Sequence, residues 1–132
     1  MTTEEKITYW IDLADYDLET AKAMLEAKRF LYVGFMCHQV IEKLLKAYWS
    51  KVLSEPPLKI HNLARLAAQT RLIEEMTEEQ QHFIDLLAPM NIEARYPDYK
   101  SKLAETLSQK NCRSILNKTN ALGLWIKEKL SK

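Results

Sequence analysis

The chain has 132 residues, of which 47% are hydrophobic and 28% are charged. This length fits one globular domain over residues 1–132 and excludes two. Nineteen basic and eighteen acidic residues give a net charge of +1, which excludes a molecule that binds nucleic acid through its overall charge. Folding should bury roughly two thirds of the unfolded chain's surface, so the core needs no disulfide or structural metal.

The cysteines and the apolar segments indicate a reducing compartment. Cys37 and Cys112 lie in apolar contexts without metal-ligand spacing, so we expect buried thiols and no bound metal or cofactor. No charged segment followed by an apolar one opens the chain. The longest apolar run covers residues 30–37 and is far shorter than the roughly 20 residues that span a bilayer. We therefore expect a cytoplasmic protein without membrane contact.

The charges are unevenly distributed along the chain. Residues 1–28 carry seven acids and three lysines, whereas residues 100–132 carry eight bases and two acids. One explanation is that two neighbouring helices present complementary faces to each other. The other is a basic surface that binds a phosphate-rich partner. The sequence leaves both explanations open.

Helix is the predicted secondary structure throughout, because the chain has only two glycines and four prolines and no sustained β-branched alternation. Apolar residues three and four positions apart predict a first helix over residues 3–27, with Thr2 and Glu5 as its capping box. A second helix is predicted over residues 32–53, because two prolines follow and end it. It is apolar on several faces, which is typical of the centre of a bundle.

Two short helices are predicted to follow the prolines. Asn62 or His61 lies near the start of the first, and Thr77 with Gln80 forms a capping box for the second, which Pro89 interrupts.

A polar loop then covers residues 91–99, a helical turn lies near residues 102–107, and a last long helix begins near Ser108. The complete pattern predicts an all-α fold, an antiparallel bundle of about five helices.

Polar residues at one-turn spacings form a narrow strip on the second helix: His38, Gln39, Glu42, Lys43 and Lys46. We expect buried groups that satisfy one another, with Glu42 bonded to His38 or paired with a lysine. The alternative is a polar strip at the interface with a second copy or a partner. His61 is expected to anchor its loop, and His82 is expected to be exposed.

The loop over residues 91–99 holds the arginine that is the strongest candidate for ligand binding. Arg95 presents five donors in a planar fork that matches phosphate, and the tyrosines beside it can stack on a base. A contact between Arg95 and Asp98 or Glu93 that only fixes the loop is the alternative. The candidate nucleotide-binding or partner-binding residues of this region are Arg95, Tyr96, Asp98, Tyr99, Lys100 and Lys102.

Three short segments occur in an order that resembles a known family. They read Gln-x-x-Glu-Lys-x-x-Lys-Ala over residues 39–47, Ile-His-x-Leu over residues 60–63 and Ala-Arg-Tyr-Pro-Asp over residues 94–98. Together they resemble the HEPN domain (higher eukaryotes and prokaryotes nucleotide-binding) over nearly the whole chain. The resemblance implies a bundle of about five helices that often dimerises. Such domains are commonly encoded beside a minimal nucleotidyltransferase, in prokaryotic pairs of toxin–antitoxin type or in nucleotide-handling modules.

The sequence departs from the HEPN domains that act as metal-independent ribonucleases. In those enzymes a histidine follows an arginine by four to six residues, and no arginine of this chain is followed by a histidine at that spacing. Acid–base catalysis near neutral pH favours histidine, so we expect no ribonuclease activity.

The resemblance therefore implies a non-catalytic module that binds a nucleotide or a nucleotidyltransferase subunit, working as a homodimer, with RNA as a less favoured ligand. Two alternatives stay open. One is a divergent ribonuclease that uses Arg95 with Tyr99 or Lys100, and the other is a purely structural dimerisation protein.

Overall fold

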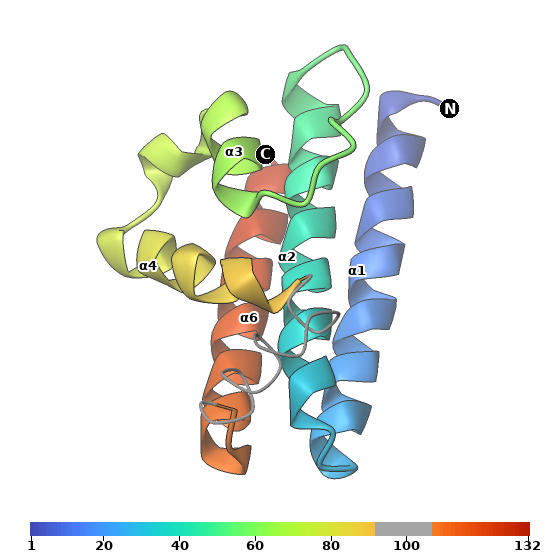
Figure 1. Ribbon diagram of the computed structural model, residues 1–132. Coiled ribbons are helices and arrows are strands. Elements are labelled where there is room, and N and C mark those ends of the chain that lie inside the picture. The colour runs from blue at the N-terminus through green and yellow to red at the C-terminus, as the bar shows by residue number, and fades with distance from the viewer. Residues whose placement is uncertain (92–106) are drawn as a thin grey trace.

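The computed structural model describes residues 1–91 and 107–132, and this part of the chain contains helices and no strand, as the all-α prediction requires. Five α-helices and two short 3-10 helices account for most of it (Figure 1). In chain order these are α1 (Thr3–Glu26), α2 (Phe30–Val52), α3 (Leu63–Gln69), η1 (Leu72–Glu75), α4 (Glu78–Leu87), η2 (Ala88–Met90) and α6 (Gln109–Leu130).

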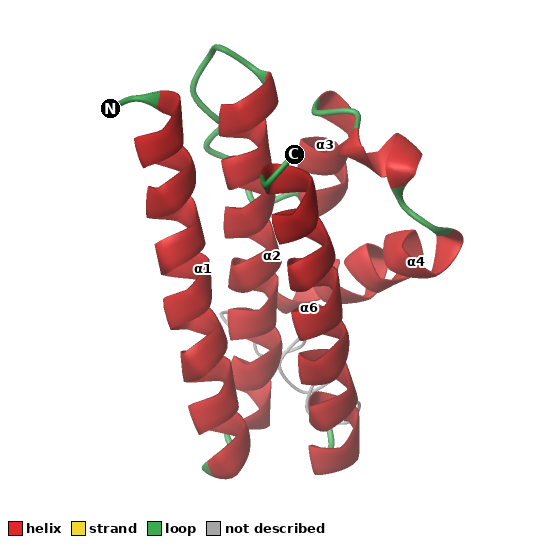
Figure 2. Cartoon of the chain, turned by 180° about the vertical axis from the view of Figure 1, so that it is seen from behind, coloured by secondary structure: helices red, strands yellow, loops and turns green. Residues whose placement is uncertain are grey.

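The three long helices form a row with α2 in the middle (Figures 1 and 2). Helix α1 runs antiparallel to α2, whereas α6 runs in the same direction as α2, so that both chain ends lie at the same end of the row (Figure 1). Helices α3 and α4 lie on one side of the row, and α4 crosses the direction of α2 and α6. Helix α4 packs on α3 and α2, and one of its sides faces α6.

The central position of α2 follows from its composition. Its buried residues lie on several faces, whereas α1 buries only Ala14, Asp17 and Ala21 fully. At Gly34 a side chain would meet Met90 Sδ at 2.8 Å, so glycine lets η2 pack directly against α2. The largest fully buried side chains are Trp49, Ile41, Leu44, Leu45, Leu63, Leu66, Leu72, Ile84, Leu87 and Ile126.

The predicted helix starts are confirmed where local capping chemistry sets them. Thr2 and Thr77 each form the expected capping box, and the side chains of Asn62 and Ser108 accept hydrogen bonds from the backbone N–H groups three residues ahead. Asn62, rather than His61, is therefore the cap of α3.

The link between α1 and α2 is shorter than predicted, because α2 begins at Phe30 rather than residue 32. Lys28 adopts a left-handed conformation with φ 59°, and the backbone N–H of Arg29 donates to the Met24 carbonyl at 2.8 Å. This arrangement ends α1 and turns the chain within three residues. A lysine in place of the usual glycine is why the sequence did not reveal the turn.

The first explanation for the uneven charges holds for the C-terminal half of α6. Lys127 Nζ lies 2.5 Å from an Asp15 carboxylate oxygen on α1, and Lys129 Nζ lies 3.0 Å from a Glu75 oxygen in η1. Complementary charges of neighbouring elements thus meet in this region.

The two cysteines are buried and free, as predicted, and burial raises the pKa of both thiols to about 11. Within residues 1–91 and 107–132, no helix has the length and apolar character that crossing a membrane requires.

Candidate ligand-binding site

The candidate residues of the polar loop and the segment after it lie outside the described residues, and their roles stay predictions. The helical turn predicted near residues 102–107 also lies outside the described residues, except for its last residue, 107. This group comprises Arg95, Tyr96, Asp98, Tyr99, Lys100 and Lys102.

The polar strip on α2 is centred on the carboxylate of Glu42. Lys46 Nζ lies 3.0 Å from Glu42 Oε2, and Nδ1 of His61 lies 3.0 and 3.1 Å from the two carboxylate oxygens. The Glu42 and Lys46 side chains are only 5% and 9% exposed, whereas the His61 side chain is 60% exposed. Lys46 also lies 5.7 Å from the centre of the Trp10 ring on α1. The His61 contact thus joins its loop to α2.

His38 is buried, and of the two partners expected for Glu42, His38 or a lysine, the structure shows the lysine, Lys46, and no hydrogen bond to His38. Its Nδ1 lies 3.7 Å from Glu42 Oε1, beyond hydrogen-bond distance, because the carboxylate is engaged by His61 and Lys46. Neither ring nitrogen has a hydrogen-bond partner among the described residues. Burial lowers the pKa of His38 to about 4, although the Glu42 carboxylate opposes the shift. The ring therefore belongs to the core as a neutral group.

The remaining two residues of the strip contact different elements. Lys43 pairs with the nearly buried Asp17 of α1. The side-chain amide of Gln39 donates to Asn91 Oδ1 at 2.8 Å, just after η2. The strip therefore joins α2 to α1, to the loop before α3 and to the end of η2, and all of its polar side chains except His38 have a partner.

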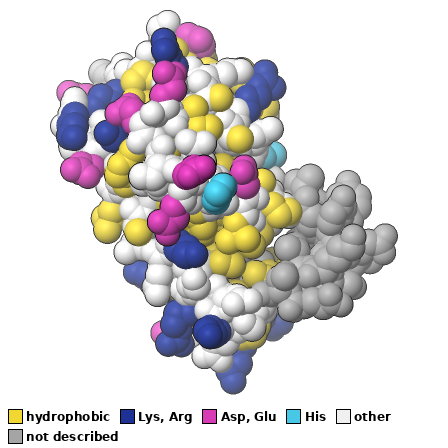
Figure 3. Space-filling model, turned by 90° about the vertical axis from the view of Figure 1, so that its left-hand side faces the viewer, with side chains coloured by type: hydrophobic (Ala, Val, Ile, Leu, Met, Phe, Trp, Pro, Cys, Tyr) yellow, Lys and Arg dark blue, Asp and Glu magenta, His cyan; other side chains and the backbone are white. Residues whose placement is uncertain are grey.

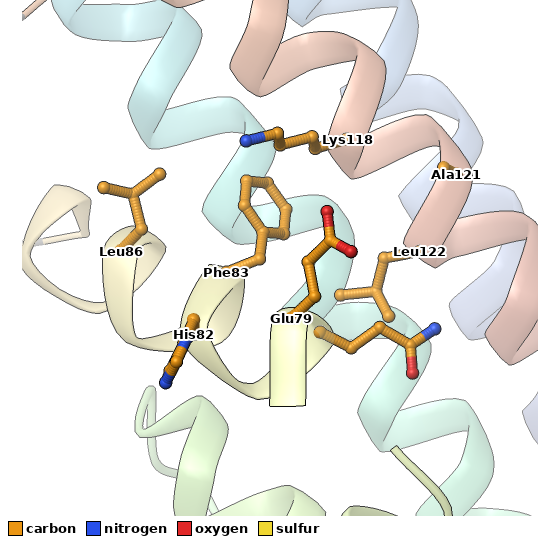
Figure 4. A pocket seen from close by; sticks show the side chains of 8 residues that line it. Glu79, His82, Phe83, Leu86, Lys118, Ala121 and Leu122 are labelled. Atoms are coloured by element: carbon orange, nitrogen blue, oxygen red, sulfur yellow. The ribbon is translucent and has the colours of Figure 1, made fainter. Parts of the chain in front are cut away.

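A hollow of about 430 Å³ opens between α4 and α6, a size that suits a small organic ligand (Figure 4). Phe83 points from α4 toward α6, Lys118 reaches across its ring, and Leu122 closes the other side. Leu86 adds apolar surface, and His82 points away from α6. We call this feature the α4–α6 hollow, and it is lined by Glu79, Gln80, His82, Phe83, Leu86, Lys118, Ala121 and Leu122.

A row of exposed polar and basic side chains continues the hollow along the first half of α6. Their spacing of three and four residues places them on one face of the helix, and Lys118 belongs to both features. The twelve residue-to-residue steps from position 110 to position 122 correspond to a rise of about 18 Å along the helix. We call this row the basic stripe, and it comprises Gln109, Lys110, Arg113, Ser114, Asn117 and Lys118.

The three cations of the basic stripe differ from the other lysines of α6. Lys110, Arg113 and Lys118 form no ion pair with any described residue, whereas Lys127 and Lys129 are paired. Helix α6 has no acid before Glu128. Figure 3 shows hydrophobic side chains gathered on the face that carries α4, with Lys and Arg side chains below them. Unpaired cations beside an exposed apolar surface can bind a ligand that is apolar at one end and anionic at the other.

The described residues contain no group of three or more His, Cys, Asp or Glu side chains arranged to hold a metal ion.

A family model for the HEPN domain matches residues 7–129. The chain belongs to the HEPN domain family. This result confirms the resemblance and its all-α bundle, and it assigns the chain to a family of nucleotide-related or RNA-related domains in general. No curated protein and no solved structure matches this HEPN domain.

The α4–α6 hollow is the feature that sequence reasoning missed. Phe83 and Leu86 are apolar residues of the helix that Thr77 caps, and Lys118 is one of the eight bases among residues 100–132. The available signal was the absence of acids from the first half of α6 together with the spacing of its bases. The approach of α4 to α6 depends on long-range packing and has no local signature.

Proposed function

We propose that this HEPN domain binds a phosphorylated nucleotide across the α4–α6 hollow and the basic stripe, without cleaving it. The observation that carries the proposal is a set of three exposed cations, Lys110, Arg113 and Lys118, which have no ion-pair partner within residues 1–91 and 107–132 and which continue into a largely apolar hollow. Family membership supports the ligand class.

Each part of the surface matches one part of a nucleotide. Leu86 is 47% exposed and offers apolar contact to a base, whereas Phe83 is 7% exposed and adds little accessible surface. Lys118 lies at the junction, where the first phosphate would be placed. The Arg113 guanidinium can hold phosphate oxygens with two donors, and Lys110 adds charge one turn further along the helix.

Binding without catalysis agrees with the positions of the three histidines. Cleavage of RNA by transfer to its own 2′-hydroxyl uses one group to remove a proton and another to supply one. His38 is buried and His61 is bound to Glu42, so His82 is the one imidazole among the described residues that lines the α4–α6 hollow. A single imidazole favours a binding role.

Arg95 belongs to a second version of the site. In this version the guanidinium of Arg95 and the rings of Tyr96 and Tyr99 hold the nucleotide, assisted by Lys100 and Lys102, while α6 serves only the fold. If the nucleotide binds across the α4–α6 hollow, variants of α6 weaken binding and variants of the loop do not. If it binds at the loop, the reverse holds.

Calorimetric titration of the full chain with ATP and with a short single-stranded RNA tests the proposal. We expect Lys118→Glu to weaken binding about tenfold or more, equivalent to about 1.4 kcal/mol. Lys22→Glu makes the same charge change on α1, where Lys22 pairs with Glu19, and it should leave affinity unchanged. Equal affinities for both variants would refute the α4–α6 site. Loss of binding in Arg95→Ala alone would place the nucleotide at the loop.

The same surface could receive the phosphates of a nucleotide held by another protein. We include in the proposal a nucleotidyltransferase subunit as protein partner, in a toxin–antitoxin type of pair, with the domain as a homodimer. Co-purification with the product of the neighbouring gene, together with light scattering of the isolated chain, tests this part. Intact RNA after incubation without metal supports the non-catalytic role, and cleavage that Arg95→Ala abolishes would establish the ribonuclease alternative.

A further inference from the structure

His61 is set apart from the other two histidines by its environment. Its Nδ1 lies 3.0 and 3.1 Å from the two oxygens of the Glu42 carboxylate, while its side chain is 60% exposed. An ionised carboxylate only accepts hydrogen bonds, so Nδ1 carries the hydrogen that is shared with Glu42. In the neutral ring the lone pair is therefore on Nε2, at the other edge of an exposed imidazole.

The carboxylate that orients His61 is itself held firmly. Glu42 is 5% exposed, is fixed within α2 and accepts a hydrogen bond from Lys46 Nζ at 3.0 Å. A carboxylate bonded to one imidazole nitrogen fixes the tautomer and increases the electron density at the other nitrogen. Three groups thus contact one another in a row: His61 is the nucleophile, Glu42 activates it, and the buried Lys46 holds Glu42 in place.

We propose that His61 is a phosphoryl-accepting histidine whose Nε2 takes a phosphoryl group from a reactive donor of the acyl phosphate or phosphoramidate class. This site is independent of the nucleotide surface between α4 and α6. Two features favour a phosphoryl group. The exposed Lys59, two residues earlier, can attract an anionic donor, and the Glu42 carboxylate can compensate the positive charge that the ring acquires.

The transfer balances without any further reactant. The Nε2 lone pair forms the new N–P bond, and the bond from phosphorus to the leaving group of the donor breaks. The leaving group, a carboxylate from an acyl phosphate or ammonia from phosphoramidate, takes the electron pair. The Nδ1 hydrogen stays in its bond with Glu42, whose carboxylate, shared with Lys46, stabilises the phosphorylated imidazolium electrostatically.

The wild-type chain contains its own control for this reaction. His82 is exposed and makes no hydrogen bond to a described residue, so its ring lacks the orienting carboxylate. The folded chain is incubated in parallel with phosphoramidate and with acetyl phosphate, and phosphohistidine is located by mass spectrometry as an acid-labile addition. We expect at least one donor to label His61 about tenfold faster than His82. In guanidinium chloride this advantage should disappear.

Two variants separate activation by Glu42 from simple exposure. His61→Asn should remove the fast-labelled site. Glu42→Gln keeps the size of the side chain and should slow the labelling of His61 about tenfold while His82 is unaffected, with circular dichroism reporting whether the variant folds. Labelling by one donor only identifies the donor class. Equal labelling of His61 and His82 in the folded wild-type chain, or labelling of neither by both donors, would overturn the proposal, whatever the variants do.

Discussion

The charged side chains of α2 and those of the first half of α6 lie in opposite surroundings. On α2, the carboxylate of Glu42 holds Lys46 and His61, and Lys43 pairs with Asp17. On α6, Lys110 and Arg113 are exposed and unpaired within residues 1–91 and 107–132. Polar groups that satisfy one another stabilise a fold, whereas exposed cations without partners are available to a ligand. The polar strip of α2 is therefore chiefly a joint between elements.

Removal of the Glu42 carboxylate should have the largest effect on stability. Glu42→Ala leaves the buried ammonium of Lys46 without its partner, so we expect the free energy of unfolding to fall by about 3–5 kcal/mol. Lys118→Ala on the open face should change it by less than about 0.5 kcal/mol. Urea unfolding measures both. Similar losses for the two variants would remove the distinction between the two regions.

His38 should make the chain less stable in mild acid. Its pKa of about 4 in the folded chain lies below the ordinary value of 6.5, so between these pH values the unfolded chain binds more protons. Stability should therefore rise with pH across this window, and roughly 3 kcal/mol should be lost when the pH falls from 6.5 to 4.

The variant His38→Leu separates the contribution of His38 to the pH dependence of stability from the contributions of the neighbouring Glu42, Lys46 and His61. The difference in unfolding free energy between the wild type and His38→Leu should follow the titration of one histidine. If His38→Leu has the same pH dependence as the wild type, the buried ring is not its source.

Nucleotide binding should depend on salt in proportion to the number of α6 cations that contact phosphate. For a single-stranded oligonucleotide, three such contacts predict a slope of about −2 in a plot of the logarithm of the binding constant against the logarithm of the salt concentration. Lys110→Ala and Arg113→Ala should each make the slope shallower by about 0.7. Fluorescence anisotropy of a labelled oligonucleotide at several salt concentrations measures the slope. A slope that neither variant changes would contradict contact with the basic stripe.

The paired lysine at the other end of α6 should matter least. Lys127 and Asp15 form a partly exposed ion pair, for which a double-mutant cycle should give a coupling of less than about 1 kcal/mol. The coupling should decrease further in 1 M salt. Lys127→Ala should leave nucleotide affinity unchanged, and a loss of affinity would extend the binding surface beyond the first half of α6.

Much of the fold could be predicted because local chemistry sets it. The caps at Thr2, Thr77 and Ser108 depend on contacts three residues away, and the apolar spacing of α2 indicates a central helix. The start of α2 was predicted two residues late, because Lys28 occupies a left-handed position that sequence patterns associate with glycine.

The candidate site was harder to predict because its parts are distant in sequence. Glu42 is bonded to His61, nineteen residues away, rather than to His38 one turn away, because loop geometry and not helical spacing decides which imidazole reaches the carboxylate. Phe83 and Lys118 line the same hollow only because α4 crosses α6. The roles of Arg95 and the residues around it, which lie outside the described residues, stay predictions.

Nuclear magnetic resonance tests residue by residue whether a nucleotide binds on the open face of α4 and α6. Titration of the isotope-labelled chain with ATP should shift the backbone amide signals around Phe83, Arg113 and Lys118, while signals of α1 around Lys22 stay in place. Saturating shifts confined to α1, or no shifts at millimolar ATP and with a short RNA, would contradict binding on this face.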